Sequence, residues 1–292
     1  INMERITIFT PTYNRAYTLD KCYSSLVRQT CKDFEWLIID DGSTDNTAEL
    51  VTRWQKENII SIRYIYKKNG GMHSGYNVAY ENIFSELSIC VDSDDYLLDN
   101  AIERILTFWD HNKTDGIAGI VALNVTKDGK VIGNNLPNLK SIKIYDYYNR
   151  LKGKGDKKMI YRPEVIRPYT SPEFENERLF PTAYKYFNVD LNYDMLVLNE
   201  PLCVVEYMPD GFTKNIIKHY KKNLNSYIYY RRFIMEYPNS TFKHKYNSAV
   251  HYIAECLLAK RKKWFKDSPN KLVVITAIPL GYLLYLYILI KG

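Results

Sequence analysis

The stretch Leu87-Ser88-Ile89-Cys90-Val91-Asp92-Ser93-Asp94-Asp95 is a short apolar run that ends in three carboxylates. It is too brief for a helix and is bounded by polar residues, which is typical of a buried strand. In an open α/β sheet, ligands bind at the carboxyl ends of the strands. Asp92 and Asp94 are two positions apart, so on an extended chain their side chains point to the same side. The alternative is an acidic turn followed by a helix from Ala101, with Asp99 or Asn100 as its cap.

Paired carboxylates of this kind predict a metal–diphosphate site. Mg²⁺ and Mn²⁺ prefer oxygen ligands, take one or two protein carboxylates, and fill the remaining positions with water and phosphate. Asp92 and Asp94 are therefore the candidate metal ligands.

Strand and helix patterns alternate before and after this stretch, which predicts an α/β fold with a mostly parallel sheet and flanking helices. Apolar runs at Ile6–Thr10, Phe34–Asp40 and Ile60–Tyr66 read as strands, the first ended by Pro11, and helical spacing follows each of them. The turns after these strands should gather polar loops along one edge of the sheet.

Three of those loops have a functional interpretation beside a structural one. In Thr10–Arg15, Tyr13 and Pro11 offer surfaces for a flat base, or Tyr13 simply fills the core. Asp40–Ser43 offers a carboxylate to a base or ribose, or forms a helix-capping turn. Lys67–Gly71 approaches a nucleotide, or is a solvated turn.

Four motifs follow one another in the first third of the chain: Thr10-Pro11-Thr12-Tyr13-Asn14-Arg15, Ile39-Asp40-Asp41-Gly42-Ser43-Thr44-Asp45, Asn69-Gly70-Gly71 with Asn77, and Val91-Asp92-Ser93-Asp94-Asp95. In their order and spacing they resemble the motifs of the family 2 glycosyltransferases of GT-A fold. The resemblance covers about the first 110 residues. It implies a UDP-sugar donor, with Pro11, Tyr13 and Asp41 at the nucleoside, Asp92 at the ribose or sugar, and Asp94 at the metal. The donor site that the resemblance implies also includes Arg15, Asn69, Asn77 and Ser93.

The chain departs from the family pattern just before Asn77. Ser74-Gly75-Tyr76-Asn77 stands where the family often has Ala-Arg-Asn, so an arginine contact to the nucleotide is in doubt. His73 either takes part of that role or is a surface histidine.

The resemblance also implies inversion at the anomeric carbon, which needs a base for the acceptor hydroxyl. Family members carry acidic residues at a helix start in the second half, and Phe174–Phe180 looks similar. We place the base at Glu177, which we expect to begin a helix, and keep Glu175 as the alternative. The competing interpretation is a pair of carboxylates favoured by the helix dipole.

The net charge of +7 is concentrated in the C-terminal region, because residues 211–292 hold 15 Lys and Arg but 3 Asp and Glu. This predicts a region that binds an anionic surface. The five cysteines show no C-x-x-C spacing and no signal-peptide pattern opens the chain, so we expect a cytoplasmic location. We expect a GT-A domain over 1–210 (nucleotide-sugar half 1–110, acceptor half 111–210) and a helical, membrane-associating region over 211–292.

Residues 272–290 carry no charge and approach the length of a membrane span, although Pro279 and Gly281 interrupt them. Spanning the membrane, lying in its interface, and packing in an oligomer through the C-terminal helices all stay open. The basic segment 260–266 precedes this run, with Trp264 and Phe265 as expected interfacial anchors.

We therefore expect a metal-dependent (Mn²⁺ or Mg²⁺) inverting hexosyl- or N-acetylhexosaminyl-transferase on the cytoplasmic side of the cell membrane. It would move a sugar from a UDP-sugar to a hydroxyl of a glycan acceptor in surface polysaccharide synthesis. We expect this acceptor to be lipid-linked. Rival interpretations are a nucleotidyltransferase and a membrane-docked nucleotide-binding module without catalysis. A nucleic-acid partner is disfavoured because the basic region ends in an apolar run.

Overall fold

The computed structural model describes residues 4–206 and 220–291. Contacts divide the chain into two compact units. Unit 1 comprises residues 1–170 and 185–208, and unit 2 comprises residues 171–184 and 209–292. The segment 171–184, which the sequence analysis assigned to the first domain, thus belongs with the C-terminal region.

Unit 1 is built on a nine-stranded sheet within the described part of the chain, in the order β3-β2-β1-β4-β8-β6-β9-β5, with β7 beside β9. Its first four strands are parallel, as predicted. They are β1 (Ile6–Thr12), β2 (Phe34–Asp40), β3 (Ser61–Tyr66) and β4 (Leu87–Cys90). β1 continues through Pro11 to Thr12, so the prediction that Pro11 ends it was wrong. Proline has no backbone N–H, so the strand loses one possible ladder hydrogen bond at Pro11 but continues past it.

The remaining strands make the sheet mixed. They are β5 (Tyr96–Leu97), β6 (Ile117–Val125), β7 (Ser141–Ile142), β8 (Lys157–Tyr161) and β9 (Asp194–Val204). β8 lies between β4 and β6 and runs antiparallel to both. Because of this reversal, the first residues of β8 lie at the edge where β4 ends. β9 is a single long strand, and register shifts interrupt its pairing with β6.

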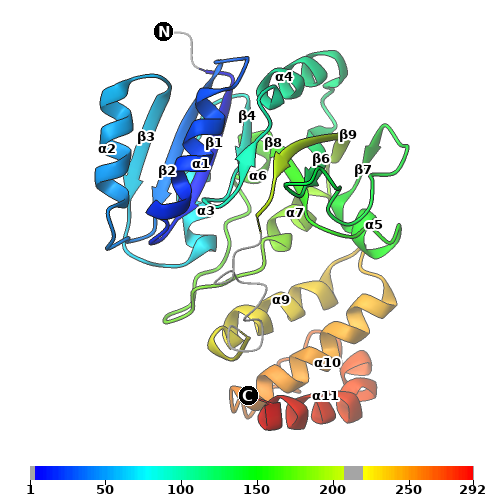
Figure 1. Cartoon of the computed structure of the whole chain (residues 1–292). Helices are drawn as coiled ribbons and strands as arrows, with labels where there is room; N and C mark the ends of the chain where they lie inside the picture. Colours follow the sequence, from blue (N-terminus) through cyan, green and yellow to red (C-terminus); the bar gives the residue numbers. More distant parts are fainter. Residues whose placement is uncertain (1–3, 207–219, 292) are drawn as a thin grey trace. The chain divides into compact units, whose positions relative to one another are not determined.

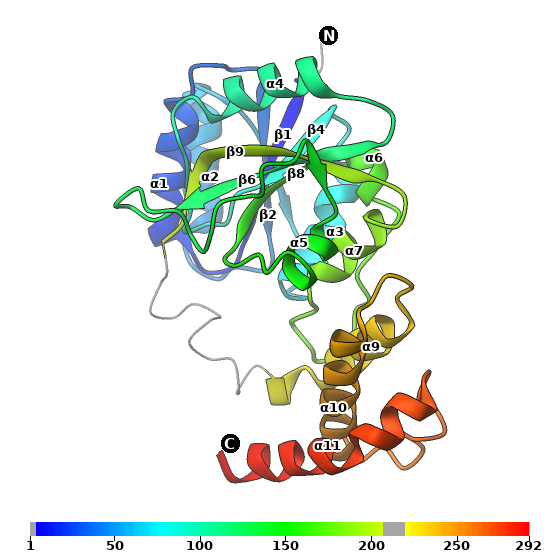
Figure 2. The same ribbon diagram turned by 90° about the vertical axis from the view of Figure 1, so that its right-hand side faces the viewer.

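Helices cover both faces of this sheet (Figures 1 and 2). Alternation along the strands sorts the side chains: Ile6, Ile8, Trp36 and Ile38 share a core cluster with α1 (Ala16–Val27), α2 (Thr47–Glu57) and α4 (Ala101–Asn112). Phe9 points to the opposite face, where its ring meets Tyr76 of α3 (Met72–Asn82) at 5.1 Å. Three further helices are short: α5 (Ile144–Asn149), α6 (Pro163–Ile166) and α7 (Ala183–Val189).

Unit 2 is helical. Its long helices are α9 (Leu224–Glu236), α10 (Phe242–Leu258) and α11 (Lys271–Lys291). Thr241 caps α10 by accepting a hydrogen bond from the backbone N–H of His244 at 3.2 Å. Trp264 and Phe265 are partly buried and pack against the core shared by α9, α10 and α11, and their role as interfacial anchors stays a prediction. Tyr252 Oη donates to the carbonyl oxygen of Trp264 at 2.7 Å and ties this segment to α10.

Candidate functional site

The carboxyl ends of the parallel strands meet at one edge of the sheet in unit 1. Thr12 pairs with Asp40, and Asp40 pairs with Tyr66, so the loops after β1, β2 and β3 begin side by side. The backbone continues this alignment by one step, because Asp41 N donates to Thr12 O at 2.8 Å. Polar loops that are far apart in the sequence are therefore adjacent, as the sequence predicted.

Asp41 joins two of these loops. Its carboxylate accepts hydrogen bonds from Lys67 Nζ at 2.6 Å, Asn69 Nδ2 at 3.2 Å, Gly70 N at 2.9 Å and Gly71 N at 2.7 Å. Four donors match the lone-pair capacity of a carboxylate. Gly42, at φ +88°, lets the loops come this close, since a Cβ there would lie 2.9 Å from Asn69 N. Asp41 and Asn69 thus shape the loop at the N-terminus of α3, while their contact with a nucleoside stays a prediction.

Asn14 joins the first and second loops. Its backbone N–H donates to Ser43 Oγ at 2.8 Å, and its side-chain oxygen accepts from Thr44 N at 2.7 Å. Asn14 has φ +52°, a conformation that asparagine tolerates better than most residues. The neighbouring Tyr13 is 48% exposed, which leaves a ring face available for stacking. Arg15 precedes α1 and stacks its guanidinium on Tyr17, 5.7 Å from the ring centroid.

The three carboxylates after β4 differ in environment. Asp92 and Asp94 are partly exposed, whereas Ser93 and Asp95 are buried. Burial raises the pKa of Asp95 to about 8, an effect that Lys158 opposes and that Asp92 and Asp94 strengthen. Asp95 also accepts a hydrogen bond from Glu206 N at 3.3 Å, so it faces the protein. Asp92 and Asp94 are therefore the two carboxylates of this group that solvent reaches, and their contact with a ligand stays a prediction.

Lys158 is a residue that the sequence analysis missed. It lies on β8, is 6% exposed, and donates through Nζ to the carbonyl oxygen of Cys90 at 3.1 Å. Burial alone would lower the pKa of Lys158, but Cys203, Asp95 and Asp92 together raise it. A buried ammonium therefore neutralises part of the acidic cluster from within the sheet. The sequence did contain a signal for this role, namely a lysine inside a strand that also holds apolar residues. Lysine is almost never buried without a partner.

Asn77 and His73 belong to α3 on the other face of the sheet. Asn77 is buried and its Oδ1 accepts from Lys185 Nζ at 2.9 Å. Lys185 also donates to Tyr169 O at 2.7 Å and lies over the Tyr80 ring, so this contact anchors α7 to α3. His73 is 1% exposed, and the reading of it as a surface histidine was wrong. Gly75 lets α3 approach β1 closely, since a Cβ there would lie 3.3 Å from Pro11 Cβ.

The donor set at the end of β4 fits the predicted divalent ion. Within residues 4–206 and 220–291, no group of three or more His, Cys, Asp or Glu is placed to hold a metal. Mg²⁺ and Mn²⁺ do not need such a group, because one or two carboxylates suffice when phosphate and water complete the shell. Asp92 and Asp94, both partly exposed, offer these two carboxylates. Asp95 is instead buried and accepts a hydrogen bond from Glu206 N.

The predicted base residues lie in unit 2. Glu177 does not begin a helix: residues 177–180 are irregular and α7 starts at Ala183, so that part of the prediction was wrong. The Glu177 carboxylate is buried and accepts four hydrogen bonds, from the backbone and side chains of Asn225 and Ser226 at 2.6–2.8 Å. It satisfies N–H groups at the start of α9, where a negative charge is favourable. Glu175, in contrast, is exposed.

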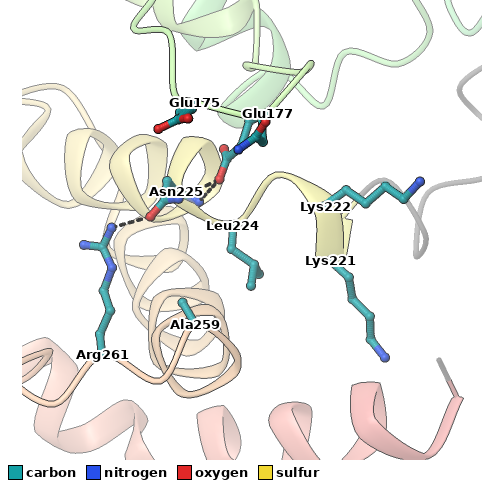
Figure 3. Close-up of a pocket in the computed structure, with 9 residues that line it drawn as sticks. Glu175, Glu177, Lys221, Lys222, Leu224, Asn225, Ala259 and Arg261 are labelled. Carbon is teal, nitrogen blue, oxygen red and sulfur yellow. Dashed lines mark hydrogen bonds between the residues drawn. The ribbon is translucent and has the colours of Figure 1, made fainter.

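Glu175 and Glu177 line a cavity of about 380 Å³ together with three cations (Figure 3). Asn225 links the two sides of this cavity: its Nδ2 donates to Glu177 Oε1 at 2.8 Å, and its Oδ1 accepts from Arg261 Nη2 at 2.6 Å. Lys221 and Lys222 also line the cavity, on the other side of Leu224 from Arg261, and in Figure 3 their side chains point away from Glu177. The buried Glu177 carboxylate thus holds the Asn225 side-chain amide, and that amide in turn orients the Arg261 guanidinium at the cavity wall.

Comparisons with known proteins agree with this architecture. Over 141 residues the chain is 35% identical to both a chondroitin synthase and a hyaluronan synthase of Pasteurella multocida, a match that covers 48% of this chain but only 14% of each synthase. It is also 31% identical over 102 residues to the glycosyltransferase GlyA of Streptococcus pneumoniae, covering 35% of this chain and 14% of GlyA. The chain thus matches about one seventh of the length of these relatives.

Solved structures share the GT-A fold at low sequence identity. S. aureus TarS 1–349 in complex with UDP-GlcNAc superposes with a TM-score of 0.62 at 18% identity, covering 95% of this chain and 80% of TarS. The mannosyltransferase PcManGT from Pyrobaculum calidifontis, in complex with GDP-Man and Mn²⁺, gives 0.57 at 15% identity, covering 97% and 81%. The model of glycosyl transferase family 2 matches residues 7–168, more than half of the chain. The chain therefore belongs to glycosyl transferase family 2.

Proposed function

We propose that this chain transfers a sugar from a UDP-sugar to a hydroxyl of a glycan acceptor, with inversion at the anomeric carbon. The observation that carries the proposal is the position of Asp92 and Asp94, partly exposed at the end of β4 on the edge where Tyr13 and the Asp41 loop also lie. UDP and UDP-GlcNAc complexes of the structural neighbour TarS support a uridine nucleotide as the donor.

On the donor side, Tyr13 and Pro11 offer surfaces for the uracil, with Arg15 nearby and Asp41 keeping the neighbouring loop in place. Asp92 binds the ribose or the sugar with Ser93 beside it, and both Asp92 and Asp94 would hold Mn²⁺ or Mg²⁺. Such an ion, when bound, supplies positive charge to the departing diphosphate. Asn77, which the resemblance assigns to the donor site, accepts a hydrogen bond from Lys185 and so joins α3 to α7.

On the acceptor side, a carboxylate must take the proton of the attacking hydroxyl. Glu175 and Glu177 are the proposed candidates, and their environments favour Glu175. The four hydrogen bonds of Glu177 use its lone pairs, whereas Glu175 is exposed.

We further propose a lipid-linked glycan acceptor and a place on the cytoplasmic face of the membrane. The cavity in unit 2 supports an acceptor that carries an anionic group, since Lys221, Lys222 and Arg261 line it. None of these three cations has a carboxylate partner among the described residues.

The proposal is tested by measuring UDP release from a panel of UDP-sugars with and without Mn²⁺. We expect metal-dependent release that is lost in Asp94→Asn and kept in Asp115→Asn, the same change at an exposed carboxylate before β6. UDP binding without turnover on any donor and acceptor would instead support a binding module without catalysis. Absence of both binding and turnover would contradict the proposal.

A further inference from the structure

α11 presents two different faces, and only one of them is covered within unit 2. Val274, Ala277 and Ile288 are buried against α10 and its neighbours. Gly281 makes the closest approach, since a Cβ at this position would lie 2.7 Å from Ile253 Cβ. The spacing of three, four and seven residues is that of one helical stripe.

The other face of α11 is apolar and exposed. Leu272 is 80% exposed, Leu283 60% and Ile290 83%, and residues 272–290 carry no charge. Tyr282 and Tyr287 lie on this surface, each about half exposed. A contiguous apolar surface of this kind marks an interaction site in a stable protein, and tyrosine is favoured where that site is a membrane interface.

Length alone would let α11 cross a bilayer. At 1.5 Å per residue its 21 residues extend about 30 Å, close to the thickness of the hydrocarbon layer. In the described part of the chain, Lys271–Ile290 is the one segment apolar and long enough to do so, and 22% of it is buried. The decision between spanning and lying flat therefore depends on its neighbours.

α10 packs along α11 over most of its length. Tyr246 Oη donates to Thr276 O at 3.2 Å, Ile253 contacts Gly281, and Ala254 shares a cluster with Ile288. A spanning α11 would carry this whole face of α10 into the hydrocarbon region. A helix that lies flat keeps α10 on the aqueous side.

α10 is unsuited to hydrocarbon. It carries Lys243 and Lys245 in its first turn, and its buried Glu255 pairs with Arg231 of α9 at 3.1 Å. Tyr220 Oη donates to the same carboxylate oxygen at 2.6 Å. Ionised groups inside a bilayer cost several kcal/mol even on permissive scales. Spanning would place this pair and the two lysines near or within the bilayer.

The segment before α11 supplies the complementary charge. Residues 260–266 include five cations, Lys260, Arg261, Lys262, Lys263 and Lys266, all exposed. Basic residues close to an anionic leaflet strengthen attachment, and apolar and electrostatic signals combined make it stable. An acidic protein partner would satisfy the cations but not the 19-residue uncharged surface beside them.

We propose that α11 lies in the plane of an anionic membrane surface, its exposed face at the boundary of headgroups and acyl chains, with α9 and α10 on the aqueous side. This inference rests on the proposed membrane location and adds the orientation of α11 relative to the membrane plane. The anionic bilayer is the occupant of the apolar face, and a second copy of the chain is an alternative that the experiment excludes or establishes.

Attachment is tested by sedimenting the full chain with vesicles of phosphatidylcholine alone or with phosphatidylglycerol. We expect binding to the anionic vesicles, weakened about tenfold or more by Leu283→Asp, because burying a leucine contributes about 1.5–3 kcal/mol. Lys262→Gln with Lys263→Gln should weaken binding at low salt. The matched controls in unit 1 are Leu151→Asp and Lys127→Gln with Lys130→Gln, at exposed positions, and they should bind like the unaltered chain.

Orientation is tested by synthesis of the chain with an added C-terminal peptide tag in the presence of anionic vesicles, followed by protease. A helix in the plane leaves the tag digestible without detergent. A tag protected until detergent is added would show a span and overturn the inference. Equal sedimentation of the chain and of Leu283→Asp, with a stable oligomer in solution, would assign the apolar face to self-association. UDP binding measured without vesicles stays the separate test of the proposed reaction.

Discussion

Lys158 Nζ lies 3.1 Å from the carbonyl oxygen of Cys90, two residues before Asp92. This contact places a buried positive charge behind the carboxylates that end β4, and it exists because β8 runs antiparallel to β4. The acidic cluster therefore has an internal counter-charge that belongs to a distant part of the chain.

Replacement of Lys158 by methionine should destabilise unit 1 by about 1–3 kcal/mol, because it leaves the buried Cys90 carbonyl without its donor and removes the positive charge that opposes the rise in the pKa of Asp95. The free energy of unfolding in urea measures this cost. In the double variant with Asp95→Asn the loss should be smaller than the sum of the two single losses. Strict additivity would show that Lys158 and Asp95 do not interact.

Asp94→Asn should reduce metal-dependent turnover by about 10²-fold or more, because it removes a charged ligand from the ion that stabilises the leaving diphosphate. The measurement is the initial rate of UDP release at saturating Mn²⁺, beside Mn²⁺ binding by calorimetry. Unchanged turnover would contradict the assignment of Asp94 to the metal.

Glu177→Gln should lower the stability of unit 2 by about 1–3 kcal/mol, because the amide cannot accept four hydrogen bonds at the start of α9. Thermal unfolding and amide exchange of α9 report this loss directly. A variant of normal stability that lacks only glycosyl transfer would restore Glu177 as the base.

Glu175→Gln is the complementary experiment. The side chain is exposed, so stability should not change, while a missing general base should slow transfer by about 10²–10⁴-fold with UDP binding unaffected. Glu173→Gln, also at an exposed acid of the same segment, serves as the matched control. Full activity of Glu175→Gln would remove it from the candidates.

Unit 2 should lose stability in mild acid. Burial lowers the pKa of His251 on α10 to about 4, with Arg231 adding to the effect. A histidine whose folded pKa is depressed binds a proton more readily when unfolded, so stability is present above about pH 6.5 and declines as the pH falls to about 4. The loss should be on the order of 1–2 kcal/mol, since the ring is partly exposed. His251→Gln should reduce the pH dependence of unfolding over this range, and the remaining dependence belongs in part to His244, whose pKa burial also lowers to about 4.

How far the sequence predicts this molecule depends on the range of the interactions involved. The strands Phe34–Asp40 and Leu87–Cys90 and the loops after them follow from local apolar patterns, so their meeting at one sheet edge could be foreseen. The environment of Glu177 could not be foreseen, because its hydrogen-bond partners are 48 and 49 residues away at the start of α9. Lys158 depended on the direction of β8, which an apolar run does not encode.

The four donors gathered on Asp41 have a consequence for the thermodynamics of recognition. A loop that is already fixed by hydrogen bonds loses little conformational freedom when a ligand arrives, so association requires almost no ordering of the chain. The Lys67–Gly71 segment should therefore show slow amide exchange before any nucleotide is added. Nucleotide binding should then have a small unfavourable entropy, and a rate limited by diffusion and orientation rather than by a conformational step.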